Sequence, residues 1–141
     1  MAKKASSSFV IPDEVIVNKI FFIRGRKVML DSDLADLYQV ETKRLKEQVR
    51  RNIERFPKHF MFELSKEEAE VSRSQNATLK RGENIKYLPY AFTEHGVLML
   101  SNVLKSKRAI AVSIRIIDVF VQLREAFLDN TELRLAIEQI R

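Results

Sequence analysis

Basic side chains gather in one short stretch of the chain, TKRLKEQVRR, at residues 42–51. The candidate contact residues of this stretch are Thr42, Lys43, Arg44, Lys46, Arg50 and Arg51. Five of them are cations, and Glu47 is the one carboxylate in the stretch, which leaves a net charge of +4. Lysine and arginine bind phosphate oxygens, and arginine can also donate two hydrogen bonds to the edge of a guanine. This composition therefore predicts contact with a polyanion such as double-stranded DNA.

The apolar residues of the same stretch predict the helix that would present these cations. Leu45, Val49 and Ile53 recur at intervals of four, which is the spacing of a buried helix face. The charged side chains are then expected to point to solvent. Thr42 is expected to begin the helix and to cap it, because a threonine hydroxyl can accept hydrogen bonds from the exposed amides of a first turn.

A shorter amphipathic segment precedes the basic helix. Leu34, Leu37 and Tyr38 recur at helical spacing around the small Ala35, and a short turn ending at Val40 follows. A short helix, a tight turn and a basic second helix are typical of a helix-turn-helix, whose second helix lies in the major groove. Helical hairpins that bind no nucleic acid can show the same pattern with a merely solvated charged face. The pattern alone leaves both interpretations open.

Two more polar segments hold candidate contacts. Hydrophobic periodicity disappears over residues 73–86, a predicted loop that offers Arg73, Gln75, Asn76, Lys80 and Arg81. A long polar loop is as often simply mobile, so its role stays open. A β-hairpin is predicted between Asn18 and Leu30, because two apolar runs flank Gly25, which can adopt the positive φ of a tight turn. The tip of this hairpin carries Arg24, Arg26 and Lys27, which are expected to make weaker contacts with the DNA backbone.

The middle of the chain predicts a strand followed by a short helix. Pro57 disfavours helical backbone at Phe56, so the basic helix should end there. Residues 59–64 alternate, with Phe60, Phe62 and Leu64 on one side and His59, Met61 and Glu63 on the other, which is the period of a half-buried strand. Ser65 and Glu68 then form a capping box for a helix from residue 66 to about residue 72.

The C-terminal half predicts one more strand and two longer helices. Residues 87–92 surround Pro89, which would suit a strand at a sheet edge. Thr93 should cap a helix over residues 94–104, and a break precedes the longest helix, over residues 108–128. The helix over residues 94–104 is expected to bury Val97, Leu98, Leu100, Val103 and Leu104. The predicted fold class is a small α+β domain with a β-hairpin, a helix-turn-helix-like pair, short additional strands and long C-terminal helices.

Length and composition are those of one folded domain. The 141 residues are 45% hydrophobic and 31% charged, and only 3 Gly and 3 Pro leave little room for the many tight hairpins of an all-β fold. A net charge of +6 favours a polyanion partner, and the absence of cysteine is compatible with a reducing cytoplasm. No run approaches the roughly 18 apolar residues of a membrane span. The domain is expected over residues 11–128, after a disordered basic tail at residues 1–10.

The end of the chain predicts a coiled-coil seam and hence a homodimer. From Val112 onward, apolar positions recur at alternating intervals of four and three. The residues expected to pair two chains are Leu123, Asn130, Leu133, Ile137 and Ile140, with residues 129–141 beginning the coiled coil. Up to residue 128 the opposite side is also apolar, with Ile114, Ile117 and Val121, and this side is expected to pack on its own domain.

Two alternatives to this seam stay open. Residues 129–131 could break the helix, since Asn and Thr favour caps over helix interiors, and a separate helix would then fold back. The same C-terminal helices could also grip a different protein, such as a repressor, in which case the basic face would be incidental.

Enzymatic patterns are weak in this sequence, and no catalytic residue, metal site or cofactor is predicted. Asp13 followed by Glu41 and Lys43 superficially matches the two acids and lysine of metal-dependent nucleases. In such sites the second acid and the lysine lie along a strand, whereas here they enter a helix, which makes the match poor. Two histidines without any cysteine form no convincing zinc site.

Four motifs in order resemble the phage ORF-six-N domain family, which is related to the KilA N-terminal and Bro N-terminal domains. They are DLADLYQVETKRL, RFPKHFMFEL, RSQNATL and PYAFTEHGVLML, the last followed by a long helix with Ala109 and Ile110. The resemblance covers roughly residues 11–128 and implies a small α+β DNA-binding domain of phages and prophages, often in regulatory or antirepressor-like proteins. The chain departs from the family pattern at Lys46, where the resemblance implies an uncharged polar residue, often Asn.

Overall fold

A four-stranded antiparallel sheet lies at the centre of the computed structural model, which describes residues 11–75 and 88–129. Its strands are β1 (Ile20–Ile23), β2 (Arg26–Leu30), β3 (Met61–Glu63) and β4 (Tyr90–Phe92). Their order across the sheet is β1-β2-β4-β3. Helices accompany the sheet, so the predicted mixed α+β class and the predicted hairpin are confirmed.

The two faces of the sheet support two separate cores. Met29, Met61 and Phe92 point to the larger core, which the helices α3, α4, α6 and α7 complete. Neighbouring residues in the same strands, including Val28 and Ala91, point to a smaller core on the other face. Because successive side chains of a strand alternate between its faces, a sheet covered on both sides buries nearly every residue of its inner strands.

This two-sided burial corrects two predictions about the strands. The half-buried strand predicted over residues 59–64 is shorter, Met61–Glu63, and apolar residues pack on both of its faces: Met61 is 7% exposed in the larger core and Phe62 packs against the smaller one. The edge position expected for residues 87–92 is also wrong, since β4 pairs with β2 on one side and β3 on the other. Pro89 is tolerated because it precedes the paired residues, and its carbonyl accepts a hydrogen bond from the Leu64 amide at 2.9 Å.

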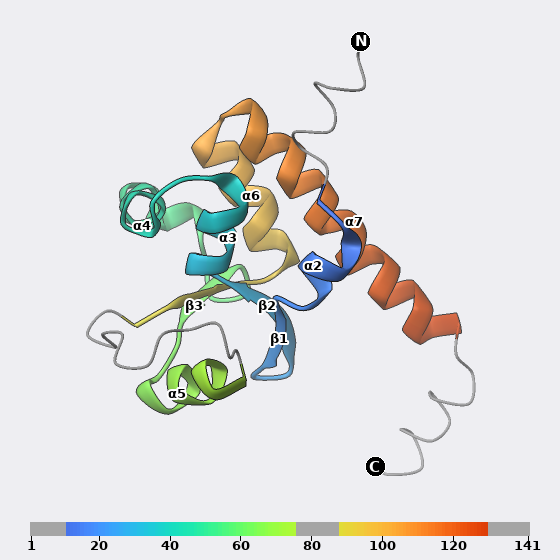
Figure 1. Ribbon diagram of the computed structural model, residues 1–141. Coiled ribbons are helices and arrows are strands. Elements are labelled where there is room, and N and C mark those ends of the chain that lie inside the picture. Colours follow the sequence, from blue (N-terminus) through green and yellow to red (C-terminus); the bar gives the residue numbers. More distant parts are fainter. Residues whose placement is uncertain (1–10, 76–87, 130–141) are drawn as a thin grey trace.

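The helices are distributed unevenly around the sheet. They are α2 (Asp13–Val17), α3 (Asp31–Tyr38), α4 (Thr42–Arg51), α5 (Lys66–Gln75), α6 (Glu94–Leu104) and α7 (Lys107–Asp129), with a short 3-10 turn at Ile53–Arg55. Figure 1 shows α5 apart from the group formed by α2, α3, α6 and α7, on the other side of the sheet. Among the described helices, none is long and apolar enough to cross a membrane.

α3 and α4 form the helix pair predicted from the sequence, joined by a tight turn at Gln39. This residue adopts left-handed backbone, with φ 61° and ψ 47°, and the amide of Val40 bonds the carbonyl of Ala35 at 2.9 Å. That bond closes a Schellman motif, which normally places glycine at the left-handed position. A second tie comes from α7, where Nε of Arg108 donates to the Leu37 carbonyl at 3.0 Å. The turn therefore fixes how α4 leaves α3.

Replacing Gln39 with Gly is expected to stabilise the domain by about 0.5–1 kcal/mol. Left-handed backbone costs a residue with a Cβ about 1–2 kcal/mol, and part of this gain is lost to the greater freedom of glycine in the unfolded chain. The exposed Gln39 side chain makes no hydrogen bond described for residues 11–75 and 88–129. Urea unfolding of Gln39→Gly beside Gln39→Ala measures the effect, and equal midpoints for the two variants would contradict it.

The α6–α7 hairpin closes the larger core. As predicted, Thr93 caps α6, with its hydroxyl 3.4 Å from the amide of Gly96. Gly96 lies so close to the Phe60 carbonyl oxygen that a Cβ would clash with it, so α6 needs glycine there to approach β3. Val97 and Leu100 are fully buried, as expected, but Leu98 is 53% exposed and its predicted burial is wrong.

The two faces of α7 differ from the prediction at most positions, although Ile117 packs against the domain as expected. Val112, Ile116 and Val119 were expected to line a seam between two chains, yet they are at most 2% exposed within their own domain. Leu123 is partly buried against the same core. Ile114, expected to pack on the domain, is 56% exposed. The other predicted seam residues, Asn130, Leu133, Ile137 and Ile140, lie outside the described residues.

Candidate nucleic-acid interface

α4 presents four of its five basic side chains on the side away from the core. Leu45 and Val49 are fully buried, and together they anchor the helix to the domain. The side chains of Lys43, Arg44, Arg50 and Arg51 are exposed, and that of Thr42 is partly exposed. Figure 1 places α4 at the outside of the molecule, next to α3. Within residues 11–75 and 88–129, the exposed side chains of α4 are therefore accessible to a partner.

Both ends of α4 differ from the sequence prediction. The capping position belongs to Glu41, and Thr42 is the first helical residue, with no side-chain hydrogen bond capping the helix. At the other end the α-helix stops at Arg51, and a 3-10 turn follows. Ile53 belongs to that turn and is 51% exposed, so its predicted burial on the helix face is wrong. The side chain of Asn52 bonds the Gln48 carbonyl at 2.8 Å, which helps to end the helix.

Lys46 is the main correction to the predicted basic surface. Its side chain is only 11% exposed and its ammonium lies 3.5 Å from Oδ2 of Asp31. The same ammonium donates to the Leu88 carbonyl at 2.8 Å and lies 4.6 Å from the ring centre of Tyr90. One residue after Leu45 and three before Val49, Lys46 falls on the flank of the buried face rather than opposite it. It ties α4 to the domain and is not part of the exposed face of the helix.

The carboxylate of Asp31 binds Lys46 and two backbone amides. Its carboxylate is 4% exposed and accepts hydrogen bonds from the amide of Ser32 at 2.6 Å and from the amide of Tyr90 at 2.9 Å. Burial raises the pKa of the Asp31 carboxyl, and the Tyr90 amide and the Lys46 ammonium offset part of the rise. Because Asp31 begins α3 directly after β2, a single carboxylate joins both helices of the pair to the sheet.

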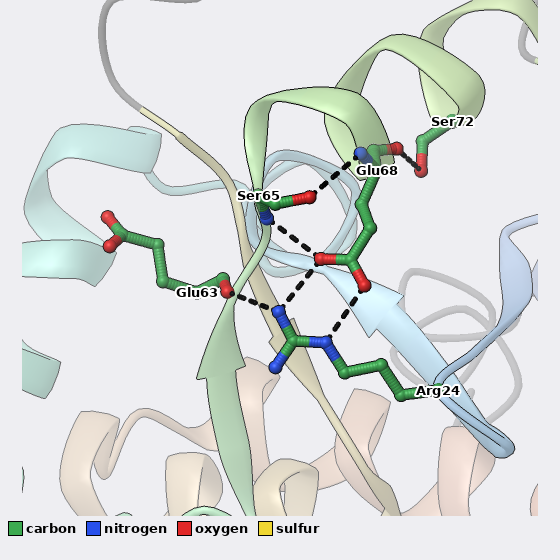
Figure 2. A network of polar contacts seen from close by, with 5 residues as sticks. All are labelled: Arg24, Glu63, Ser65, Glu68 and Ser72. Atoms are coloured by element: carbon green, nitrogen blue, oxygen red, sulfur yellow. Dashed lines mark hydrogen bonds and ion pairs between the residues drawn. The ribbon is translucent and has the colours of Figure 1, made fainter.

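Arg24, expected to touch phosphate from the hairpin tip, is instead bound within the domain. Figure 2 shows its guanidinium facing the carboxylate of Glu68, with both bonds at 2.8 Å. The same group lies 4.4 Å from the ring centre of Phe62. This hydrogen-bonded pairing is the largest cause that lowers the pKa of Glu68, to about 2. A cation held by a carboxylate and a ring is a poor candidate for binding a further anion.

Glu68 also completes the capping box that the sequence predicted for α5. Its carboxylate accepts from the Ser65 amide at 2.8 Å, and the Ser65 hydroxyl accepts from the Glu68 amide at 3.1 Å (Figure 2). The helix begins at Lys66 as expected and continues three residues past the predicted end, to Gln75. The clip between Arg24 and Glu68 thus holds the hairpin against the first turn of α5.

The remaining candidate residues are spread over several elements. Arg26 donates to the His59 carbonyl at 3.3 Å, while Lys27 is exposed on β2. Arg73 and Gln75, expected in a loop, belong to the last turn of α5. Asn76, Lys80 and Arg81 lie outside the described residues. The structure therefore groups the α4 residues together and does not place the other candidates beside them.

Two cations that the prediction left out follow α4 along the chain. Arg55 ends the 3-10 turn and Lys58 follows it, and both side chains are exposed. The signal was present in the sequence, since the basic run continues as RRNIERFPK beyond the helix. These two residues extend the candidate surface past the C-terminal end of α4.

The nuclease pattern does not assemble into a metal site. Asp13 is held by Arg115, whose Nη2 lies 2.6 Å from Oδ1. Glu41 precedes α4 and Lys43 lies within its first turn, as the sequence indicated. Over residues 11–75 and 88–129, no group of three or more His, Cys, Asp or Glu residues could hold a metal ion.

Comparison with known proteins identifies one matching family. The family model described as the ORF6N domain matches residues 18–103, which is more than half of the 141-residue chain. The match begins just before β1 and ends near the C-terminus of α6, so it includes the helix pair and the whole sheet. Neither the curated proteins nor the solved structures contain a significant match.

Proposed function

This chain belongs to the ORF6N domain family, and on that premise we propose that it is a DNA-binding regulatory domain of phage or prophage type that catalyses no reaction. The observation that carries the proposal is the exposed basic face of α4. Lys43, Arg44, Arg50 and Arg51 are exposed on a helix whose opposite side is fully buried. A helix anchored in this way offers its cations in a fixed arrangement, as major-groove recognition requires.

In this proposal α4 enters the major groove and its position is set by buried contacts. The Schellman turn at Gln39 fixes the direction of the helix, and the Lys46–Asp31 ion pair fixes its rotation against the sheet. Arg44 and Arg50 then contact phosphates or base edges, while Arg55 and Lys58 extend the contact along the backbone. Pre-positioned cations bind more tightly because less conformational entropy is lost on binding.

We propose further that the chain acts as a homodimer, because two copies of α4 at a fixed separation would recognise a repeated site one helical turn, or a multiple, apart. The second candidate function is a protein-interaction module of antirepressor type. The observation that favours it is the exposure of Leu98, Ile110 and Ile114 on α6 and α7. Under that alternative the basic face of α4 would contribute nothing to binding.

The test is a fluorescence titration of duplex DNA with the full chain, repeated across salt concentrations. Each phosphate neutralised by a cation contributes about 0.9 to the slope of log affinity against log salt. We expect affinity to fall with salt with a slope of about −3.6, from one contact for each of the four exposed cations of α4. Affinity that does not change with salt would contradict the DNA-binding proposal.

A parallel incubation of the duplex with the chain and magnesium or manganese tests for cleavage, and an intact duplex is expected.

A further inference from the structure

α7 has an apolar face that its own domain covers only in part. The side chains of Ile110 and Ile114 are 45% and 56% exposed, and those of Ile117 and Val121 are partly exposed. These four residues, named the α7 stripe from here on, follow one another at intervals of four, three and four. This is the spacing at which apolar side chains line one side of a helix and pack against a second helix.

The α7 stripe borders the face that α7 buries: Ile117 packs against the edge of the larger core, whereas Ile110 and Ile114 are exposed. Val112, Ile116 and Val119 fill the core of the domain, so they cannot also contact another molecule. The helix therefore carries apolar residues on two sides, of which the core explains only one. Single exposed apolar residues are ordinary, but a continuous apolar surface on a monomer commonly marks an interaction site.

Leu98 of α6 is a further exposed apolar side chain. It is 53% exposed and lies one turn after Glu94, whose carboxylate forms an ion pair with Arg124 of α7. α6 and α7 are consecutive helices that fold back on each other (Figure 1). One turn forward from Glu94 on α6 therefore corresponds to about one turn back from Arg124 on α7, which reaches Val121. This correspondence puts Leu98 at about the level of Val121 along α7.

We propose that the α7 stripe is the surface through which two copies of this chain associate, with their α7 helices antiparallel. A two-fold axis between Ile114 and Ile117 brings Ile110 of one copy opposite Val121 of the other, and Ile114 opposite Ile117. Every apolar residue of the stripe then meets an apolar residue, as a self-complementary two-fold interface requires.

The charges beside the stripe favour a second copy in this orientation. Lys107 and Glu125 are both exposed and lie on the same flank of the stripe, near its opposite ends. In an antiparallel pair, Lys107 of each copy approaches Glu125 of the other, which gives two ion pairs. A parallel pair would bring the two Lys107 ammonium groups to the same end. Arg124, which faces the second copy's Lys107 in the antiparallel pair, is already neutralised by Glu94.

This inference names the surface of the proposed homodimer and rests on the apolar and charged residues of α6 and α7 alone. It therefore stands or falls separately from DNA binding, because association is measured without DNA. It also replaces the seam expected from the sequence, whose first half is buried in the domain.

Sedimentation velocity of the full chain from 1 to 100 micromolar is the experiment. We expect a dimer at the upper concentrations and an increase of at least about tenfold in the dissociation constant for Ile114→Lys, since this change places two charges in the apolar contact. Phe22→Lys is the matched control, because Phe22 is 72% exposed on β1 and lies outside the stripe. Circular dichroism verifies that each variant is folded.

A charge exchange tests the orientation. Lys107→Glu and Glu125→Lys should each weaken association, and the double variant should restore it, because each ion pair re-forms with its signs reversed. A wild-type chain that is monomeric at 100 micromolar would overturn the proposal. A dimer whose dissociation constant is the same in Ile114→Lys would also overturn the proposal. That result would favour the seam predicted from the sequence at residues 130–140. If the double variant is folded but its association is not restored, the antiparallel arrangement is rejected.

Discussion

Replacing Lys46 with Ala is expected to lower the free energy of unfolding by about 3 kcal/mol, which is the range for removing one partner of a buried ion pair. The variant leaves the Asp31 carboxylate, which is 4% exposed, without the ammonium that pairs with it. It also leaves the Leu88 carbonyl without the ammonium that donates to it. Urea unfolding measures the change. A loss below about 1 kcal/mol would show that water replaces the ammonium without cost.

Lys43→Ala is the matched control for this measurement. Lys43 and Lys46 are lysines of the same helix, but the Lys43 side chain is exposed, so its loss should change stability by no more than about 0.5 kcal/mol. A double-mutant cycle with Asp31→Ala would isolate the part of the effect that belongs to the ion pair. If Lys43→Ala and Lys46→Ala lose the same free energy of unfolding, the buried Lys46 contributes no more to stability than the exposed Lys43, contrary to this prediction.

The pH dependence of the stability of Lys46→Ala is a second test of the Lys46–Asp31 ion pair. Burial raises the pKa of Asp31 above its ordinary value, and Lys46 partly offsets this rise. Without the lysine, the pKa of the folded state should rise further. An acid with a raised folded-state pKa contributes stability that is present below its unfolded pKa and is lost as the pH rises through its folded pKa. The deficit of the variant relative to the wild type should therefore be smaller at pH 4 than at pH 7.

The double variant Arg44→Ala with Arg50→Ala is expected to weaken DNA binding by roughly 100-fold at moderate salt, about 3 kcal/mol for two charge-assisted contacts. Both side chains are exposed on α4, so folding should be almost unaffected. The slope of log affinity against log salt should fall by about 1.8, because two fewer counterions are released. Fluorescence anisotropy with one duplex across salt concentrations supplies both values.

A control for this variant must remove the same charge elsewhere. Lys66→Ala with Lys105→Asn does so at the start of α5 and in the turn after α6, and asparagine tolerates the left-handed backbone that Lys105 adopts. We expect a loss of affinity below about threefold, from long-range electrostatics alone. Equal losses for the two double variants would mean that only net charge matters and that α4 is not the contact surface.

Local chemistry determined the features that the sequence predicted correctly. The capping box joins Ser65 and Glu68 across one helical turn, and the Thr93 cap needs only the amide of Gly96. The hairpin turn at Gly25 and the α3–α4 pair likewise depend on residues close in the chain. Their partners lie within a few residues, so composition and periodicity are enough to identify them.

Tertiary structure alone decided which of several similar residues face the interior. Lys43 and Lys46 look alike in the sequence, and only Lys46 is buried, because Asp31 lies 15 residues before it and the Leu88 carbonyl 42 residues after it. The two apolar sides of α7 are equally ambiguous, since periodicity shows that each exists but not which one the domain covers. Packing against the core decided this, because it buries Val112 and leaves Ile114 exposed. Contacts between residues far apart in the chain leave no periodic trace in the sequence, which is why these positions needed the fold.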